Sequence, residues 1–450
     1  MKVHFIAVGG AVMHSLAIAL ARAGHQVTGS DDEIFEPSRS RLQAEGILPE
    51  PGWNPEKITP ELDAVILGMH AFEDNPELAR ARELNLPVFS FPEFIYNQSL
   101  HKQRIVVAGS FGKTTVTAMI MHAFSKAGLD FDYVVGAQVP GFDNPVRLSE
   151  RAPMILIEGD EYFASRQDPR PKFLFYKPHS VVLTGIEWDH INVYPTQEAY
   201  EAAFEQLLSG LDKAADIIFQ DSDPVLHRLV KEFTDTDIHY LYPFVLPPYK
   251  VRDEKFQVKL GGEWGPVRIA GAHNMANLAA AWQVCELTGI EAVDFLKYME
   301  DFVGAGLRMQ TLFSSPDLAI IRDYAHAPAK VRSTVQAVKE WRSKKNLIAV
   351  FELHTFSSLD KRYLHYYKHA LKLADKRILM VDPHALEKRR LPELTDDFLR
   401  DAFGDKKLVV VHNSAELLQE LNAGRKGNDV MLLMSSGPLG GLNWEDLTKN

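Results

Sequence analysis

The chain has 450 residues, of which 46% are hydrophobic and 24% are charged, and its formal net charge is −11. One hydrophobic core does not extend over so long a chain, so we expect a globular protein of several domains. The acidic balance argues against a nucleic-acid-binding protein, which usually carries a basic surface.

Cysteine content and hydropathy indicate the compartment. The single cysteine, Cys285, cannot form an internal disulfide, and its apolar helical surroundings predict a core position. The opening MKVHFIAVGG lacks the pattern of a signal peptide, and no stretch reaches the roughly 20 apolar residues of a membrane span. We therefore expect a cytoplasmic protein with no membrane partner and no nucleic-acid partner.

Short apolar runs alternate with helical patterns along nearly the whole chain. Buried strands are predicted at 3–8, 64–69, 105–109, 154–159, 181–185, 318–324, 346–351, 377–382 and 429–435. Helical periodicity follows several of them, at 113–127, 273–289 and 328–342. This alternation is typical of parallel sheets with crossover helices, so the predicted fold class is α/β. The proline-rich stretch LYPFVLPPYK predicts a loop at 241–250.

The strand–helix pattern restarts twice, near 97–104 and near 311–317. We therefore predict three α/β domains, at residues 1–101, 102–312 and 313–450.

The stretch RIVVAGSFGKTTVTAMIMHAF has a strand, a glycine turn and a helix in the order of a phosphate site. Gly109 and Gly112 let backbone N–H groups turn inward, and the helix N-terminus adds positive potential. Lys113 would reach the terminal phosphates, and the Thr114 hydroxyl would suit Mg²⁺. The common motif needs a further glycine where this chain has Val107. A plain glycine turn beside an exposed lysine is the alternative, which the flanking strand and helix disfavour.

Acidic side chains and one histidine follow two of the predicted strands. They are Glu158, Asp160, Glu161, Glu187, Asp189 and His190. Ligands of parallel α/β sheets bind at the carboxyl ends of strands, where the glycine turn also lies. Carboxylate oxygens suit Mg²⁺, and a neutral imidazole can complete its shell. An acidic cluster after a single strand is commonly just part of a turn. Because both clusters and the glycine turn are expected at the same edge of the sheet, a metal–nucleotide site is favoured.

Two further element ends carry polar side chains. The stretch GAHNMANL places Asn274 and Asn277 three residues apart, on one face of a helix start, where one of them could simply cap the helix. The stretch RDYAHAP ends a strand with Asp323, Tyr324 and His326.

Together these segments resemble the Mur ligase family, the ATP-dependent amide ligases that build the peptide stem of bacterial cell walls. The resemblance covers nearly the whole chain. The family's loop, Gly-(Ser/Thr)-x-Gly-Lys-(Ser/Thr)-Thr, matches GSFGKTT, which explains the failure of the stricter motif. The resemblance implies that ATP contacts Gly109, Ser110, Gly112, Lys113, Thr114 and Thr115.

The same resemblance implies the remaining groups around ATP. The Mg²⁺ ligands would be Thr114, Glu158 and His190, and the catalytic residues Lys113, Glu158 and His190. The family's GxHNxxN segment, which holds the adenine, matches His273, Asn274 and Asn277. Arg308 in GLRMQ and Asp323 in DYAHAP would clamp ATP when the third domain closes.

The first domain resembles the part of the family that binds the UDP of the substrate, with a Rossmann-like fold. In VHFIAVGGAVMHSLAIALARAGHQVTGSD the implied contacts are Gly9, Gly10, Ser30 and Asp31. The resemblance also implies a central P-loop ATPase domain with a mostly parallel sheet and a Rossmann-like C-terminal domain. A dinucleotide-binding oxidoreductase would share the first segment, but it would leave the GSFGKTT loop and both acidic clusters unexplained.

The absence of a lysine near position 204 limits the substrates that the resemblance implies. Many members have a carbamylated lysine near the position of Phe204, and members acting on UDP-N-acetylmuramate lack it. Two amine substrates then remain, free L-alanine and the tripeptide L-Ala-γ-D-Glu-meso-diaminopimelate used in cell-wall recycling. The stretches IEGDEYFASRQDPRPKFLFYKP, HFIAVGGAVMHSLA and LLMSSGPLGGL resemble the tripeptide enzyme more closely.

The tripeptide carries several carboxylates, so its site in the third domain needs cations or N–H donors. Thr355 stands where the resemblance would place an arginine. The implied amine-substrate residues are therefore His326, His354, Lys361 and Arg362, with His326 also a candidate proton acceptor. The stretch DKRYLHYYKHAL predicts a helix whose start would bind an anion. The alternative is that Lys361 and Arg362 are solvated charges opening a surface helix.

Overall fold

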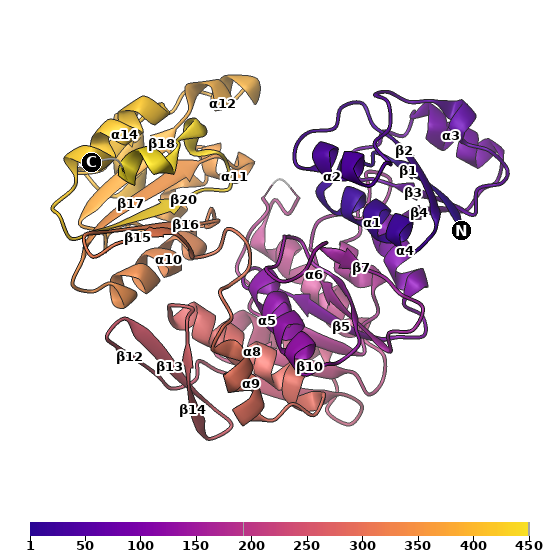
Figure 1. The fold of residues 1–450 in the computed structure, drawn as a ribbon, viewed down its shortest axis with the longest axis horizontal. Coiled ribbons are helices and arrows are strands. Elements are labelled where there is room, and N and C mark those ends of the chain that lie inside the picture. Colours follow the sequence, from indigo (N-terminus) through magenta and orange to yellow (C-terminus); the bar gives the residue numbers. More distant parts are fainter. Residues whose placement is uncertain (192, 449–450) are drawn as a thin grey trace. The chain divides into compact units, whose positions relative to one another are not determined.

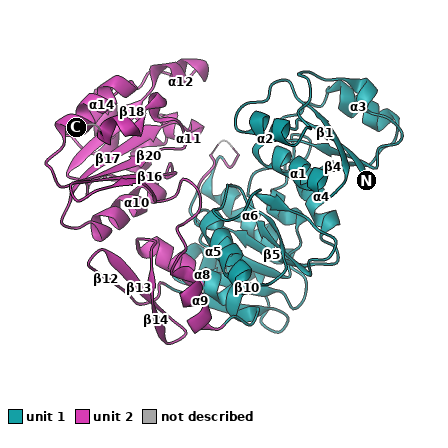
Figure 2. Ribbon diagram, viewed as in Figure 1, with its two compact units in different colours: residues 1–188, 195–245, 280–290 teal, residues 189–194, 246–279, 291–450 magenta. Residues whose placement is uncertain are grey.

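The computed structural model describes residues 1–191 and 193–448. Its elements form two compact units, drawn in two colours in Figure 2. The first unit comprises residues 1–188, 195–245 and 280–290, and the second comprises residues 189–194, 246–279 and 291–450.

The chain begins with a four-stranded parallel sheet of order β2-β1-β3-β4 (Figure 1). Its strands are β1 (Lys2–Ile6), β2 (Gln26–Ser30), β3 (Ala64–Leu67) and β4 (Val88–Ser90). Its helices are α1 (Ala11–Arg22), α2 (Ser38–Ala44), η1 (Pro55–Lys57), α3 (Pro76–Glu83) and α4 (Phe91–Gln98). The apolar runs predicted as strands supply its core, in which Ile6, Val65 and Leu78 are buried.

The second sheet of the first unit has seven strands in the order β11-β10-β9-β5-β8-β6-β7. They are β5 (Gln103–Ala108), β6 (Asp132–Val134), β7 (Val146–Arg147), β8 (Met154–Glu158), β9 (Ser180–Leu183), β10 (Asp216–Gln220) and β11 (Tyr240–Phe244). All neighbours pair in parallel except β6 and β7. The helical elements are α5 (Lys113–Lys126), η2 (Lys172–Phe175), α6 (Gln197–Ser209) and α7 (Pro224–Phe233). Because β5 is central, the loop after it lies between the ends of β8 and β9.

The prediction of a loop over 241–250 is correct only for 245–248, because strands occupy residues 241–244 and 249–250. Residues 240–244 form β11, which pairs in parallel with β10 along its whole length. The strand contains Pro243, which lacks an N–H donor. Since β11 is the edge of the sheet, the missing donor costs no bond inside it. A proline signals the end of a central strand but not of an edge strand.

The second unit contains a small antiparallel sheet, β12-β13-β14. Its strands are β12 (Tyr249–Arg252), β13 (Lys255–Leu260) and β14 (Glu263–Val267). They are followed by α8 (Ala272–Leu287) and α9 (Ala292–Met299).

The C-terminal sheet has six strands in the order β15-β16-β20-β17-β18-β19, of which only β15 runs antiparallel to its neighbour. They are β15 (Gln310–Ser314), β16 (Leu318–Asp323), β17 (Asn346–Leu353), β18 (Lys376–Val381), β19 (Val409–Val411) and β20 (Asp429–Met434). The helical elements are α10 (Pro328–Trp341), α11 (Phe356–Leu359), η3 (Leu364–Tyr367), α12 (Pro383–Lys388), α13 (Asp396–Phe403), α14 (Ser414–Ala423), η4 (Leu439–Gly441) and η5 (Trp444–Thr448).

Two separate apolar clusters cover the two faces of this sheet. One includes Val331 and Val335 of α10, and the other includes Leu417 and Leu421 of α14 (Figure 1). The predicted helix at 360–371 does not form. Only the short 3₁₀ turn η3 is helical there, because the peptide N–H of His369 bonds to the carbonyl of Phe403 instead of to a preceding turn. Tertiary contacts thus override a segment whose aromatic and histidine residues are mediocre helix formers.

The α/β fold class is confirmed, every predicted strand is present, and so are the helices predicted at 113–127, 273–289 and 328–342. Cys285 is fully buried, as its sequence context predicts. Within the described ranges, no helix is long and apolar enough to cross a membrane.

Candidate active site

The glycine turn between β5 and α5 has the backbone geometry of a phosphate loop. Gly109 and Gly112 have φ angles of 127° and 78°, in the region that favours glycine. A Cβ on Gly109 would also collide with the side chain of Thr184 on the neighbouring β9 connection. The turn therefore requires glycine twice, and it directs the start of α5 towards the carboxyl edge of the sheet.

Lys113 is the first residue of α5, and its ammonium group is close to several hydrogen-bond acceptors. Its Nζ donates to the carbonyl of Gly109 at 2.6 Å and lies 2.7 Å from Oε2 of Glu161. Burial lowers the pKa of Lys113, but the carboxylates of Glu161, Asp160 and Glu158 outweigh this effect, so its pKa lies above the ordinary value. Lys113 is therefore a fixed positive charge over the physiological range.

The hydroxyl of Thr114 and the carboxylate of Glu158 meet at the end of β8. Thr114 Oγ1 donates to Glu158 Oε1 at 2.6 Å, and the N–H of Gly136 donates to Glu158 Oε2 at 2.7 Å. Among the described residues, no three His, Cys, Asp or Glu side chains gather as a metal site. Mg²⁺ at nucleotide sites takes one or two protein oxygens together with waters and phosphate oxygens. The pair fits that ion.

Tyr200, which the sequence patterns did not single out, and Glu161 complete this edge. The phenol oxygen of Tyr200, fully buried on α6, lies within hydrogen-bonding distance of both Ser110 Oγ, at 3.0 Å, and Glu161 Oε1, at 3.3 Å. Ser110 Oγ in turn accepts the N–H of Glu187 at 2.7 Å. Tyr200 stands one helical turn before Phe204, and this polar group on an otherwise buried helix face is the signal that sequence could have offered. Glu161 belongs to a predicted acidic cluster, but its role as the partner of Lys113 was not foreseen.

His190 belongs to the second unit and follows Asp189. His190 Nε2 lies 3.9 Å from Asp189 Oδ2, which also accepts a bond from Lys330 Nζ at 3.0 Å. Burial raises the pKa of Asp189, but the charges of Lys330, His190 and His326 together outweigh burial and hold this pKa well below its usual range. Since Thr114 and Glu158 belong to the first unit, joint binding of Mg²⁺ with His190 stays a prediction.

The first turn of α8 contains the predicted adenine residues. Asn274 Nδ2 donates to the carbonyl of Ala270 at 2.9 Å, and its Oδ1 accepts Nδ2 of Asn277 at 3.2 Å. The two side chains share one face, as their spacing predicts. Burial lowers the pKa of the neighbouring His273 against the opposing charge of Asp323. Their contact with adenine stays a prediction.

Asp323 holds together the segments that carry the predicted clamp. Its Oδ2 accepts the N–H of Met309 at 2.8 Å, and its Oδ1 accepts the N–H of Ala325 at 2.8 Å. The guanidinium of Arg308 lies 5.5 Å from the ring centre of Tyr324, a cation–π contact. The structure brings Arg308 and Asp323 into one neighbourhood.

His326 follows β16 and has a neutral imidazole near pH 7. Its Nδ1 donates to the carbonyl of Tyr324 at 2.9 Å, which leaves Nε2 as the acceptor in that tautomer. Burial, reinforced by the charge of Lys330, lowers the pKa of His326 to about 4. An imidazole in this state can accept a proton.

The predicted amine-substrate residues of the third domain differ in their surroundings. His354 lies against Gly437, where an added Cβ would come within 2.5 Å of its Nδ1. Arg362 is 81% exposed and binds Asp360 at 2.6 Å, and Lys361 Nζ lies 5.3 Å from the ring centre of Phe398. The predicted anion-binding helix start is absent, because no helix begins at Lys361 and Arg362.

The predicted UDP-substrate residues meet at the end of β2. Asp31 Oδ2 accepts the N–H of Gly9 at 2.7 Å, so the carboxylate braces the glycine turn of Gly9 and Gly10. Ser30 is fully buried, and its hydroxyl accepts a bond from Lys57 Nζ at 3.2 Å. Burial raises the pKa of Asp31 against the two N–H bonds that it accepts. Contact with UDP stays a prediction.

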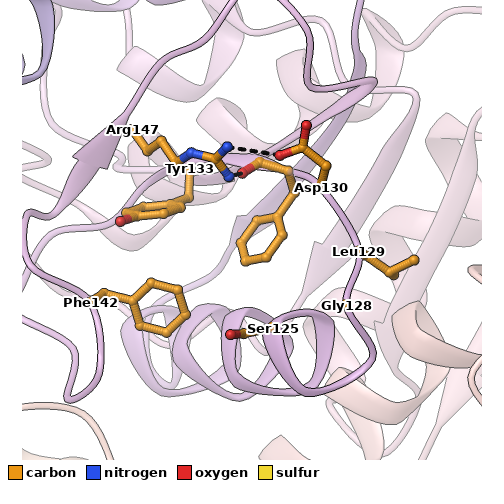
Figure 3. Close-up of a pocket in the computed structure, with 8 residues that line it drawn as sticks. Ser125, Gly128, Leu129, Asp130, Tyr133, Phe142 and Arg147 are labelled. Carbon is orange, nitrogen blue, oxygen red and sulfur yellow. Dashed lines mark hydrogen bonds and ion pairs between the residues drawn. The ribbon is translucent and has the colours of Figure 1, made fainter. Parts of the chain in front are cut away.

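A cavity of about 400 Å³ lies at the other end of α5 (Figure 3). It is lined by Ser125, Gly128, Leu129, Asp130, Phe131, Tyr133, Phe142 and Arg147. Ser125 is twelve residues beyond Lys113, which corresponds to about 18 Å along a helix. Arg147 is bonded to Asp130 at 2.8 Å, so its charge is already compensated. This cavity is separate from the phosphate loop.

Comparisons with known proteins match the chain in three consecutive parts. Residues 2–103 match the Mur ligase family catalytic domain, residues 107–285 the Mur ligase middle domain, and residues 307–437 the Mur ligase glutamate ligase domain.

Individual relatives extend the similarity over the whole chain. The UDP-N-acetylmuramate–L-alanine ligase of Carboxydothermus hydrogenoformans is 26% identical, with 100% of this chain and 97% of the relative aligned. That of Aquifex aeolicus is 27% identical over 97% of this chain and 95% of the relative.

Solved structures show the same fold at lower identity. A murein peptide ligase from Psychrobacter arcticus aligns with 100% of this chain and 98% of its own, with a TM-score of 0.67 and 22% identity. A UDP-N-acetylmuramate–alanine ligase from Thermotoga maritima aligns with 97% and 96%, with a TM-score of 0.72 and 22% identity.

Proposed function

Because the chain belongs to the Mur ligase family, we propose that it joins the carboxyl group of UDP-N-acetylmuramate to the amine of L-Ala-γ-D-Glu-meso-diaminopimelate, in the recycling of cell-wall peptide. The enzymes of this family are ATP-dependent amide ligases that require Mg²⁺. The substrates are small cytoplasmic molecules, so we expect the enzyme to act there.

One observation carries the ligase assignment. Lys113, with its raised pKa, stands at the N-terminus of α5, beside the oxygen pair of Thr114 and Glu158. An oxidoreductase has no use for that combination, whereas transfer of a phosphoryl group needs a fixed cation and oxygen donors for a metal.

The proposed reaction has two steps. A carboxylate oxygen of the muramate attacks the γ-phosphorus of ATP, the bond to the ADP oxygen breaks, and an acyl phosphate forms. The peptide amine then attacks the acyl carbon, the bond to the phosphate oxygen breaks, and the amine loses a proton.

The residues of this chain would neutralise charge and move that proton. Lys113 would oppose the charge that develops on the transferred phosphoryl group. Mg²⁺, held by Thr114 and Glu158, would supply further charge neutralisation. His326, neutral near pH 7, is the proposed acceptor of the amine proton.

The choice of the tripeptide rests on the connection between β8 and β9. This segment, IEGDEYFASRQDPRPKFLFYKP, is the longest stretch resembling the tripeptide enzyme. It is an ordered part of the fold, with Lys172 Nζ 2.5 Å from Asp160 Oδ2, an antiparallel bridge between Phe163 and Pro171, and a fully buried Phe173.

Ligation of free L-alanine is the second candidate, and the names of the curated relatives favour it. The two are separated by offering UDP-N-acetylmuramate, ATP and Mg²⁺ with either the tripeptide or L-alanine, and measuring phosphate release and product mass. We expect turnover with the tripeptide to be much faster. A preference for L-alanine would replace the first assignment by the second, and turnover with neither amine would exclude both.

A further inference from the structure

The carboxyl edge of the C-terminal sheet holds an arginine that the functional assignment has not used. In β16, Leu318 and Ile320 belong to the apolar cluster on the α14 face, whereas Ala319 and Ile321 belong to that on the α10 face. Strand side chains alternate between faces, so Arg322 continues the row of Leu318 and Ile320 on the α14 face. A guanidinium thus ends an apolar row.

Arg322 is partly buried and incompletely paired. Its Nη2 donates to the carbonyl of Gly437 at 3.3 Å. Its Nε is buried and has no hydrogen-bond partner among residues 1–191 and 193–448. Buried guanidinium donors are normally satisfied, so an unpaired Nε at the end of a strand indicates a ligand that accepts from it.

The loop after β20 brings a second unsatisfied donor to the same place. Gly437 directly follows Ser436, whose buried Oγ likewise lacks a partner in the described part of the chain. The loop is held from the other side by Glu352, which accepts the Ser435 hydroxyl and the N–H of Leu439, the latter at 3.0 Å. These bonds fix the loop independently of Ser436.

His354, at the end of β17, extends this polar group. Its ring packs against Gly437, and its carbonyl accepts a bond from the guanidinium of Arg389. β16 and β17 both pair in parallel with β20, so their carboxyl ends meet at the loop. Arg322 contacts this loop at Gly437, His354 packs against the same glycine, and Arg389 is bonded to His354.

Thr355, at the position of the expected arginine, and Arg362, one of the residues predicted to bind the amine substrate, both have partners within the chain. Thr355 Oγ1 accepts the N–H of Ser358 at 3.1 Å and so caps α11. The guanidinium of Arg362 is bonded to Asp360 and faces solvent. Thr355 therefore serves as a helix cap, and the Nε and Nη2 donors of Arg362 are directed to Asp360.

We propose that Arg322, with the Ser436 hydroxyl beside it, binds a carboxylate of the amine substrate and takes the role of the arginine that is absent at position 355. A guanidinium presents paired N–H donors that match a carboxylate, and this one already has its Nε free of other acceptors. The inference rests on the proposed ligase function, because it requires an amine substrate that carries a carboxylate.

The test compares Arg322→Ala with Arg400→Ala, a control whose guanidinium pairs with Asp396 and Asp397 of its own helix. KM is measured for ATP, for UDP-N-acetylmuramate and for whichever amine the wild type accepts, tripeptide or L-alanine. We expect Arg322→Ala to raise the amine KM at least tenfold and to leave the other two constants within twofold. The control should change none of the three.

A second amine, the same substrate with its carboxylates converted to carboxamides, tests which group Arg322 contacts. We expect the wild type to lose at least tenfold in kcat/KM on this analogue, and Arg322→Ala to show little further loss. Arg322→Lys and Ser436→Ala should show intermediate discrimination, and they serve if the alanine variant does not fold.

The possible results distinguish the role of Arg322 from the proposed ligase activity. Equal discrimination between carboxylate and carboxamide in the wild type and in Arg322→Ala or Arg322→Lys would assign Arg322 to holding the loop only, and would overturn the inference. Absence of wild-type turnover with any amine would overturn the proposed function itself.

Discussion

Lys113 shows what a motif predicts at the scale of one residue and what it omits. The GSFGKTT pattern placed a cation at the start of α5, and the structure pairs that cation with Glu161 at 2.7 Å. Replacing it by alanine removes the charge that opposes the phosphoryl group. We expect Lys113→Ala to reduce turnover by more than a hundredfold, or several kcal/mol of barrier at about 1.4 kcal/mol per tenfold.

Binding of the UDP substrate, measured by calorimetry, should change little in this variant, because its predicted contacts lie at the end of β2. Turnover within tenfold of the wild type would remove Lys113 from the chemistry.

Glu158 should control the Mg²⁺ requirement. In Glu158→Gln the amide keeps the shape but loses the charge, so we expect a higher Mg²⁺ concentration for half-maximal rate and a turnover reduced at least tenfold. The rate is measured as phosphate release over a magnesium titration. Glu232→Gln, a change to an exposed carboxylate on α7 that pairs with Arg228, is the matched control. A titration indistinguishable from the wild type would show that Glu158 is not a ligand.

At the scale of elements, the strand–turn–helix unit around the phosphate loop depends on one backbone conformation. Gly109 has φ 127° and no room for a Cβ, whereas Gly128, after α5, has φ 72° and open space around it. Gly109→Ala therefore combines strain with a collision, and Gly128→Ala adds strain alone, about 1 kcal/mol.

We expect Gly109→Ala to lower the melting temperature more than Gly128→Ala does, and also to abolish the increase that Mg-ATP gives. Gly128→Ala should keep that increase. Equal shifts for both variants in the presence and absence of Mg-ATP would show that the loop tolerates a side chain.

The elements that could be predicted are those whose signal is local. Apolar runs such as 105–109 and 318–324 became strands because burial on both faces demands continuous apolar sequence. The segment 360–371 has a helical pattern, but the N–H of His369 bonds to Phe403, which no local pattern records. Pro243 likewise signals a loop unless its strand is known to be an edge, and edges are set by the order of the whole sheet.

At the scale of the whole molecule, the pH dependence of stability should report the buried state of His326. Its pKa in the folded chain is about 4, below the ordinary value of about 6.5. Between these values the unfolded chain binds a proton that the folded chain does not, so stability falls as the pH decreases through this window. Near pH 7 the imidazole is neutral in both states and contributes nothing to this slope.

We expect His326→Gln to reduce the loss of melting temperature between pH 6.5 and pH 4.5, measured by calorimetry. The groups around His326 are Lys330, Asp189 and His190. Because the pKa of Asp189 is lowered, its carboxylate takes up a proton below this pH window. It should therefore not affect the stability between pH 6.5 and pH 4.5. An identical pH profile for variant and wild type would place the proton uptake elsewhere.

The candidate site could be predicted where its residues lie in short motifs at the ends of strands or the starts of helices. Thr114 with Glu158, and Asn274 with Asn277, meet as their spacing and strand positions indicate. Tyr200 and Arg322 were not found, because each reaches its partners through the packing of distant segments. Tyr200 and Ser110 are 90 residues apart, and no local sequence pattern predicts their contact.

We expect the pair of Lys113 and Glu161 to make the loop between β5 and α5 selective among anions. Sulfate or inorganic phosphate would have to displace a carboxylate that is fully buried, and would leave that carboxylate without its cation. A single small anion recovers too little in return, whereas a nucleoside triphosphate arriving with its metal also gains the backbone donors of the turn and the Thr114–Glu158 pair. The loop carries its own counter-ion, so we expect loading with ATP to be an exchange of one anion for another rather than a simple addition.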